Sequence, residues 1–214
     1  MKPKLEDIDL YFITNAEQTN SHIFEDVEAA LNAGVKIVQY REKKKTYDLM
    51  VQEALEIQKI CKDRAIFIVN DRVDVAKAVD ADGVHLGQKD LENTSYQEAR
   101  RILGPNKIIG LSASTVEEAI AAYKAGADYL GVGPIFPTRT KTDANPPGGL
   151  ELIRGVRGAL TDAVIVAIGG IKLYNTADVM NAGADSIAVI SAVTGKECVK
   201  TASRELIEII RQYK

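Results

Sequence analysis

The amino-acid sequence predicts an α/β fold in which eight strands and eight helices alternate and close into a barrel. A short β-branched or aromatic run, a turn, and a stretch with apolar residues three and four apart recur in that order along the 214 residues. The strand-like runs are apolar on both faces, as in Ile66–Val69, which is typical of parallel strands covered by helices. An open doubly wound sheet, the competing fold, usually has about five or six strands. We therefore expect one (β/α)8 TIM-barrel domain over residues 1–214, because no linker or change of composition divides the chain.

Each expected strand is a short run rich in Val, Ile, Leu and aromatic side chains, which suit a pleated, buried surface. Each run ends where glycine or polar residues begin, because such residues favour turns. In chain order the strands are expected at Leu10–Thr14, Val35–Tyr40, Ile66–Asn70, Gly83–Leu86, Lys107–Leu111, Tyr129–Val132, Val164–Ile168 and Ser186–Ile190.

Each expected helix has one apolar face, and several helices have marked ends. Ser114–Glu118 supplies a capping residue and an acidic first turn, and Gly34 follows the first helix, where a left-handed residue is needed. The phrase Ala-Gly-Ala-Asp occurs at 125–128 and at 182–185, which indicates a weak repeat of the strand–helix unit. The helices are expected at Ile23–Ala33, Tyr47–Lys62, Val73–Val79, Tyr96–Leu103, Val116–Ala125, Leu150–Ala159, Thr176–Ala182 and Glu197–Gln212.

Composition and charge exclude several classes of protein. The 27 Lys and Arg against 30 Asp and Glu leave no basic excess for binding a nucleic-acid backbone. No apolar run approaches the roughly 20 residues of a membrane span. The charged start of the chain is too short for a signal peptide, and Cys61 and Cys198 lie in unrelated contexts, as reduced, half-buried thiols would. We expect a cytoplasmic protein that acts on small molecules, as a monomer or a small homo-oligomer.

The loops that follow the strands are where a barrel of this type carries its function. Polar, charged or glycine-rich clusters follow seven of the eight expected strands. The clusters begin at Gln39, Asn70, His85, Ser112, Gly133, Gly169 and Ile190. A chain stabilised only by its core would not need this pattern.

The chemistry of these clusters indicates phosphate groups and a metal. Arg41, Lys43 and Lys141 are cations suited to phosphate oxygens. Asp71 and Asp90 lie in adjacent loops and are oxygen ligands of the kind that Mg²⁺ prefers, so we expect a diphosphate site. Gly169–Gly170 and Ile190–Ser191 follow the last two strands, the usual phosphate site of this fold. Two such sites indicate a transfer between two phosphorylated small molecules.

The sequence resembles the thiamine-phosphate synthase family over nearly its whole length. The most specific matching segments are His85–Asp90, with the pattern His-Leu-Gly-Gln-x-Asp, and Gly133–Lys141, with the pattern Gly-Pro-Ile-Phe-Pro-Thr-x-Thr-Lys. Shorter matches are Gln39–Lys43, Asn70–Asp74, Gly110–Ser112, Ala167–Ile171 and Ala188–Ala192.

The resemblance implies a reaction. The family joins 4-amino-2-methyl-5-hydroxymethylpyrimidine diphosphate to 4-methyl-5-(2-phosphoethyl)thiazole, or to its carboxylated form. The products are thiamine monophosphate and pyrophosphate, and the carboxylated thiazole also releases CO₂. In the family, pyrophosphate leaves first, a pyrimidine methylene cation forms, and the thiazole nitrogen captures it.

The resemblance also implies roles for individual residues. Mg²⁺ is expected on Asp71 and Asp90, and Ser112 is expected to donate a hydrogen bond to the leaving pyrophosphate. Gln39 is expected on the edge of the pyrimidine ring. The diphosphate is expected to contact Arg41, Lys43, Asn70 and Lys141. The thiazole phosphate is expected to contact Thr138, Thr140, Gly170, Ile190 and Ser191, the last three partly through backbone N–H groups.

Simpler interpretations of these residues stay open from the sequence. Asp71 can cap the third helix, Asp90 can be a turn residue, Ser112 can fill space at the barrel mouth, and Gly169–Gly170 can serve close packing alone. We interpret His85 as structural and Lys44 and Lys45 as surface charge. Phe136 can pack the loop or cover a substrate, and Arg139 has no assigned contact.

Three other functions are also open. The thiazole tautomerases share the fold, but they use a histidine near Ser114 and lack the Thr-x-Thr-Lys loop. The other candidates are a phosphate-binding barrel without turnover and an isomerase of phosphorylated sugars. An isomerase would want paired acid and base groups at the rim.

Overall fold

The fold is a closed barrel of eight parallel strands, in agreement with the sequence-based prediction. A computed structural model of the chain describes residues 4–88, 95–138, 140 and 145–214. The strands pair in chain order, and β8 pairs with β1 to close the barrel. Their bounds are β1 Leu10–Ile13, β2 Ile37–Tyr40, β3 Ile66–Asn70, β4 Gly83–Leu86, β5 Ile108–Ala113, β6 Tyr129–Val132, β7 Ile165–Ile168 and β8 Ser186–Val189.

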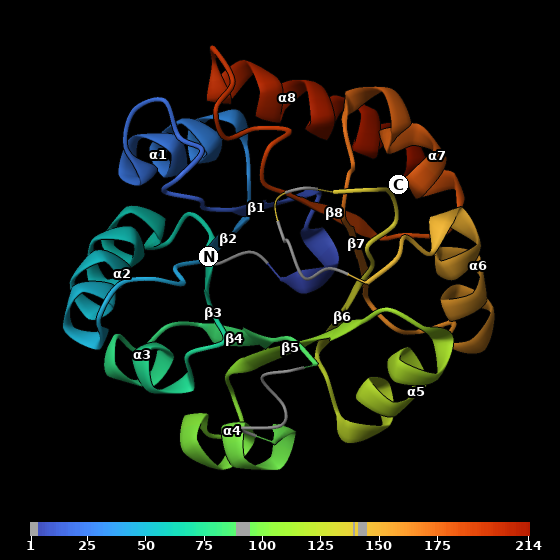
Figure 1. Cartoon of the computed structure of the whole chain (residues 1–214), viewed down its shortest axis with the longest axis horizontal. Helices are drawn as coiled ribbons and strands as arrows, with labels where there is room; N and C mark the ends of the chain where they lie inside the picture. Colours follow the sequence, from blue (N-terminus) through green and yellow to red (C-terminus); the bar gives the residue numbers. More distant parts are fainter. Residues whose placement is uncertain (1–3, 89–94, 139, 141–144) are drawn as a thin grey trace.

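The helices form an outer ring around the strands (Figure 1). Within the described residues, no helix is long and apolar enough to cross a membrane. Their bounds are α1 Ile23–Ala33, α2 Tyr47–Cys61, α3 Val73–Ala78, α4 Tyr96–Leu103, α5 Val116–Ala125, α6 Gly149–Ala159, α7 Thr176–Asn181 and α8 Val199–Ile210. Short 3-10 turns lie at Leu5–Asp7 (η1), Leu173–Asn175 (η3) and Arg211–Tyr213 (η4).

Five strands differ from the expected bounds by one or two residues, and the two largest differences have clear reasons. The β2 strand begins at Ile37 instead of Val35, because the Val35 amide still bonds to Ala30 and completes the end of α1. The β5 strand ends at Ala113 instead of Leu111, because Ser112 and Ala113 pair with β6. Ser112 is therefore part of the barrel wall and not of the loop after it.

Alternation along each strand separates two apolar layers. One set of positions faces the surrounding helices and forms the larger core, with Leu10, Phe12, Phe67 and Leu130 among its members. The alternate set fills the inside of the barrel. The inner cluster consists of Ile8, Tyr11, Ile13, Ile37, Ile66, Ile68, Tyr129, Val166 and Ala188.

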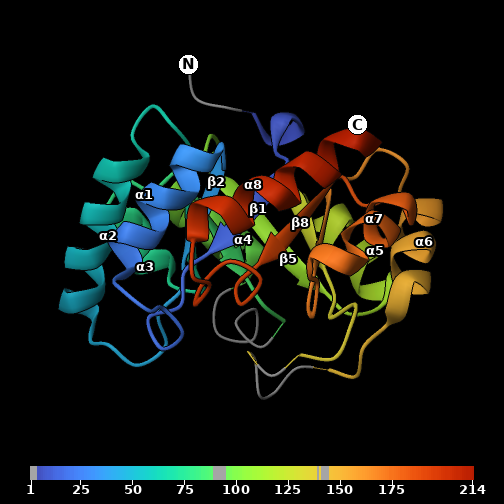
Figure 2. The same cartoon turned by 90° about the horizontal axis from the view of Figure 1, so that it is seen from above.

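One end of the barrel is closed by the two ends of the chain. The η1 turn lies across the centre of the barrel in Figure 1, and its Leu5 packs on the inner cluster. Arg211 donates to a carboxylate oxygen of Asp9 at 2.8 Å, and Lys214 donates to the Ile8 carbonyl. The loop after β6 lies at the opposite end (Figure 2). Function is therefore expected at that second end.

The repeated Ala-Gly-Ala-Asp phrase has a structural cause. The Asp128 and Asp185 carboxylates each accept a backbone N–H from the start of the preceding strand, from Ile109 and Ile165 respectively, at 2.7 Å. Arg157 in α6 donates to Asp185 at 2.5 Å and also to four backbone carbonyls, among them those of Gly183 and Thr161. Each such aspartate fixes a helix-to-strand corner.

We expect Arg157→Ala to lower the free energy of unfolding by about 2 kcal/mol, because several carbonyls lose a charged donor at once. Arg157→Lys keeps the charge but not the planar fork of donors, so it should restore only part of the loss. Urea unfolding followed by circular dichroism measures the effect.

Arg154→Ala in the same helix is the matched control. Within the described part of the chain, Arg154 pairs only with the exposed Glu151, so the change should stay within about 0.5 kcal/mol. Equal effects of the Arg157 and Arg154 substitutions on the free energy of unfolding would contradict the role of Arg157 at the helix-to-strand corner.

Candidate active site

A cavity of about 300 Å³ opens at the end of the barrel where the strands finish. All of the predicted site residues that the structure describes line it, although they come from six different loops or strands. Asp90 and Lys141, like Arg139, lie outside the described residues. The lining includes Gln39, Arg41, Lys43, Asn70, Asp71, Ser112, Thr138, Thr140, Gly170, Ile190 and Ser191.

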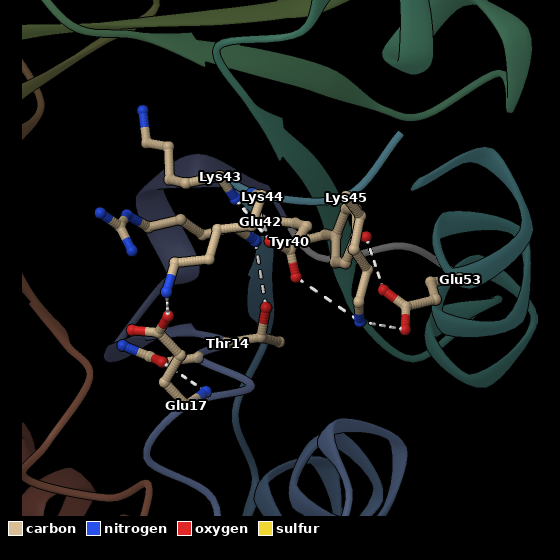
Figure 3. Close-up of polar contacts among 10 residues, drawn as sticks. Thr14, Glu17, Tyr40, Glu42, Lys43, Lys44, Lys45 and Glu53 are labelled. Carbon is tan, nitrogen blue, oxygen red and sulfur yellow. Dashed lines mark hydrogen bonds and ion pairs between the residues drawn. The ribbon is translucent and has the colours of Figure 1, made fainter. Parts of the chain in front are cut away.

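The loop after β2 holds four cations, two of which are paired with acids that do not line the cavity. Lys44 forms an ion pair with Glu17, and Lys45 forms one with Glu53 at 2.6 Å (Figure 3). Burial lowers the pKa of the Lys45 ammonium, but Glu53 and Glu42 together outweigh burial and raise this pKa overall. The interpretation of Lys45 as plain surface charge is therefore wrong.

Arg41 and Lys43 remain for a ligand. The Arg41 amide donates to the Thr14 hydroxyl at 3.0 Å, which fixes the start of the loop. Its guanidinium lines the cavity and makes no ion pair with any described residue. Lys43 extends away from Lys44 and Lys45 in Figure 3, and its ammonium contacts the Asp71 carboxylate.

The Asp71 carboxylate is held at the rim by its backbone. Asp71 has a φ of +61°, an uncommon value for a residue with a side chain, and its amide donates to the His85 carbonyl at 2.8 Å. The Asn70 amide group donates to its carboxylate at 2.5 Å. The helix α3 has Arg72 at its N-cap position, so the alternative that Asp71 caps this helix is wrong.

The donors near Asp71 suit a magnesium ion that is shared with a substrate. Mg²⁺ is usually bound through one or two carboxylates together with substrate phosphates. Asp71 supplies one such carboxylate beside Arg41 and Lys43. Among the described residues, no three His, Cys, Asp or Glu side chains gather into a site made by the protein alone. The residues present therefore fit Mg²⁺ only with phosphate oxygens as additional ligands.

A second anion-binding region lies on the other side of the cavity, after β7 and β8. Gly169 and Gly170 have φ values of +101° and +65°. A Cβ atom on Gly170 would lie 2.6 Å from the Pro137 carbonyl oxygen, so close packing already requires glycine there. The backbone N–H groups of Gly170 and Ser191 donate to no acceptor in the part of the chain that the structure describes. These N–H groups can bind an anion.

Lys172 adds a positive charge to this region. Its ammonium donates to the Ser191 hydroxyl at 2.7 Å. Burial, and then the charge of Lys196, lower the pKa of Lys172. No carboxylate among the described residues pairs with it. An anion bound beside Ser191 would supply the missing countercharge.

The loop after β6 brings two threonines to the cavity. Backbone bonds of 2.9 Å from Ile135 and Phe136 to the end of β7 hold the start of this loop. Thr138 and Thr140 then line the cavity. Phe136 packs against the larger apolar core, which supports the loop-packing alternative.

A chain of hydrogen bonds crosses the floor of the cavity. Gln39 Nε2 donates to the Tyr11 hydroxyl at 2.8 Å, which bonds to the Tyr129 hydroxyl at 2.8 Å. The Tyr129 hydroxyl bonds to His85 Nδ1 at 2.9 Å, and His85 Nε2 bonds to the Ser112 hydroxyl at 2.9 Å. Ser112 therefore does more than fill space.

Four residues of the site escaped the sequence-based prediction of site residues. Lys172 lies two residues after Gly170, and nothing in the sequence distinguishes it from an ordinary surface lysine. Tyr11 and Tyr129 lie within strands, where the loop pattern gives no signal, and from the sequence we interpret His85 as structural. The alternation of the strands offers a signal, because these three residues occupy inward-facing positions like that of Gln39.

The arrangement suits two anionic groups bound on opposite sides of a polar floor. Arg41, Lys43 and Asp71 lie on one side, and Gly170, Ser191 and Lys172 lie on the other. The hydroxyl and amide groups between them can orient an uncharged heterocycle.

Comparison with known proteins gives one consistent result. Residues 10–193 match the protein family described as thiamine monophosphate synthase. A thiamine-phosphate synthase of Methanosarcina mazei is 51% identical over 210 residues, which cover 98% of this chain and 86% of the relative. One of Methanosarcina barkeri is 49% identical and covers 97% and 93%. The solved structure of a thiamine phosphate pyrophosphorylase from Pyrococcus furiosus superposes with a TM-score of 0.88 at 40% identity, over 98% of both chains.

The difference between Arg41, which has no described acid partner, and Lys44, which pairs with Glu17, predicts how each contributes to binding of inorganic pyrophosphate. Arg41→Ala should weaken binding by about tenfold or more, because it removes a donor of charge-assisted hydrogen bonds that pairs with no described acid. Lys44→Ala should change the affinity by less than about twofold, because Lys44 is exposed and already paired. Isothermal titration calorimetry in Mg²⁺ buffer measures both, and similar losses would contradict this difference.

Proposed function

The chain belongs to the thiamine-phosphate synthase family, a family of transferases in thiamine biosynthesis, and we propose how its cavity carries out the reaction. The substrates are a pyrimidine methyl diphosphate and a thiazole monophosphate or its carboxylated form. The products are thiamine monophosphate and pyrophosphate. The observation that supports this assignment is the pair of anion-binding regions on opposite sides of one cavity.

The diphosphate binds on the side of β2 and β3. Arg41 and Lys43 pair with its oxygens, and the Asn70 amide donates to it. Lys43 can exchange its bond to Asp71 for one to the diphosphate, because both partners are anionic oxygens within its reach. Lys141, outside the described residues, is assigned to the same group by the family pattern.

Mg²⁺ is assigned to Asp71 and Asp90, the second of which lies outside the described residues. When bound, the ion neutralises charge on the leaving pyrophosphate. Arg41 and Lys43 contribute to the same end, because they lie beside the carboxylate that would hold the ion.

The thiazole phosphate binds on the side of β7 and β8. The N–H groups of Gly170 and Ser191 donate to it, and Ile190 contributes its backbone. Lys172 supplies the positive charge through the ammonium that now bonds to Ser191. Thr138 and Thr140 lie between this region and the diphosphate and contact the thiazole.

The reaction is dissociative. The bond between the methylene carbon and the diphosphate oxygen breaks first, and the electron pair leaves with pyrophosphate. The amino-pyrimidine donates electrons to the resulting cation, and the lone pair of the thiazole nitrogen then forms the new carbon–nitrogen bond. No protein nucleophile is needed, so the protein holds the ring edge with Gln39, donates to the leaving group with Ser112, and excludes water.

We also propose that the protein works in the cytoplasm, as a monomer or a small homo-oligomer. Neither cysteine forms a disulfide: Cys61 is buried and Cys198 is exposed, which corrects the expectation of two half-buried thiols. Cysteines without disulfides are typical of a reducing compartment.

A product assay tests the function. The purified protein, both substrates and Mg²⁺ should yield thiamine phosphate, detected after oxidation to thiochrome phosphate. EDTA should abolish the signal, and Ser112→Ala should lower kcat by about 100-fold, the usual cost of one donor to a developing negative charge. If the folded protein forms no product with either thiazole, the synthase function is wrong, and the tautomerase and the binding protein become the favoured alternatives.

Lys172→Met tests the thiazole side. We expect the KM for thiazole phosphate to rise by about tenfold, because one charge-assisted hydrogen bond is lost. The free energy of unfolding should stay unchanged or rise by up to about 1 kcal/mol, because the substitution removes a half-buried cation that pairs with no carboxylate of the described residues. Lys124→Met, on the exposed side of α5, should change neither quantity, and a thermal melt with steady-state kinetics measures both.

A further inference from the structure

The hydrogen-bond chain on the cavity floor joins two of the proposed substrate contacts. Gln39 stands at one end and Ser112 at the other, with Tyr11, Tyr129 and His85 between them. Only the two end residues have been assigned a ligand. The three middle residues decide which atoms the end residues can offer to it.

The direction of the chain is set at Gln39. Its side-chain nitrogen can only donate, so Tyr11 accepts this bond. Within the described residues, the only other hydrogen-bond partner of the Tyr11 hydroxyl is Tyr129, so Tyr11 donates to Tyr129. A buried hydroxyl without an acceptor would cost about 1–3 kcal/mol, which excludes the opposite arrangement around Tyr11.

The same argument continues to Ser112. Tyr129 accepts from Tyr11, and its remaining partner in the described chain is His85 Nδ1, to which it donates. His85 then carries its hydrogen on Nε2 and donates to the Ser112 oxygen. Burial raises the pKa of both tyrosines, so both phenols keep the hydrogen that the chain needs.

This orientation is the one that an anion requires. Ser112 accepts from His85 and therefore keeps its own hydrogen for a ligand. The reversed chain would have Ser112 donate to His85 and present only lone pairs to a phosphate oxygen. The binding of an anion at this position therefore favours the direction that Gln39 sets.

Neighbouring strands make room for the rings of the chain. The rings of His85 and Tyr129 stack with centroids 5.4 Å apart. A Cβ atom on Gly110 would lie 2.1 Å from the Tyr129 ring, and one on Gly131 would lie 2.8 Å from the His85 ring. No side chain larger than glycine fits at either position while the rings stay in place.

We propose that His85, Tyr129 and Tyr11 are positioning residues that hold the Ser112 hydroxyl as a donor toward the departing diphosphate, with His85 as a neutral imidazole that carries its hydrogen on Nε2. The role toward the diphosphate rests on the proposed function. The state of His85 does not, because it belongs to the protein without substrates.

The first experiment determines that state in the full chain without substrates. The protein has two histidines, and His22→Asn removes the other one while keeping a residue suited to the N-cap position of α1. Two-bond nitrogen–proton NMR correlations of ¹⁵N-histidine-labelled protein at neutral pH distinguish the two tautomers. The hydrogen should lie on Nε2, and a hydrogen on Nδ1 would overturn the proposal.

Two tyrosine variants form a matched pair. Tyr129→Phe removes the donor to Nδ1, so the strong preference for the Nε2 tautomer should be lost. Tyr11→Phe removes the next hydroxyl but leaves Tyr129 able to donate, so the tautomer should not change. An identical response of His85 to both variants would contradict the chain.

Kinetics test the effect on Ser112. His85→Phe should lower kcat by about tenfold and leave the KM for the pyrimidine diphosphate within about threefold. His85→Gln can place an amide N–H near the Nε2 position and should restore most of kcat. In a Ser112→Ala background, His85→Phe should have no further effect, because His85 acts only through that hydroxyl.

The outcomes separate the two proposals. Multiplicative losses in the double variant would show that His85 acts by another route. A wild-type protein without synthase activity would overturn the proposed function, whereas the NMR result on the free protein would still decide whether the chain runs from Gln39 to Ser112. If His85→Phe does not fold, the tautomer and its response to Tyr129→Phe still decide the direction.

Discussion

The closure of eight short parallel strands into one barrel is the constraint on which the rest of the structure depends. Once the barrel is closed, every second residue of a strand faces the inside, and there is space for only a few large side chains. Toward the closed end these positions carry Ile37 and Ile66. Toward the open end they carry Gln39, His85 and Ser112. The same alternation that builds the core therefore builds the floor of the site, and the site inherits the rigidity of the strands.

The ion-pair partners of the rim cations, and not the number of these cations, decide which of them can bind a ligand. Lys44 and Lys45 follow Arg41 and Lys43 directly, yet acids on α2 and on the loop after β1 neutralise them. Arg41 stays without a described acid partner, and so does Lys172 on the far side of the cavity. A cation without a countercharge loses hydration when the site forms, and a bound phosphate restores the balance. The anionic substrates thus complete an electrostatic arrangement that the described residues leave positive.

Glycine and strained backbone have distinct roles around the cavity. Gly110 and Gly131 give up side-chain volume so that Tyr129 and His85 can stack inside the barrel. Gly170 serves the packing of the loop after β6 and also exposes its N–H group. Asp71 adopts a left-handed conformation without being glycine, because the bond from its amide to His85 fixes the turn. The same rim residues therefore serve both the packing of the loops and the binding of ligands.

The amino-acid sequence alone predicts the fold class, the element boundaries to within two residues and most of the residues that line the rim. Those features follow from local periodicity, from turn residues such as Gly34, and from the rule that parallel strands end at one edge. It did not reveal the link from Gln39 through Tyr11, Tyr129 and His85 to Ser112, because those residues are far apart in the chain and meet only across the closed barrel. Nor did it separate Arg41 from Lys44, or show that Lys172 reaches Ser191. Only the tertiary structure decided these points, because hydrogen-bond and ion-pair partners depend on distances between segments that no local pattern encodes.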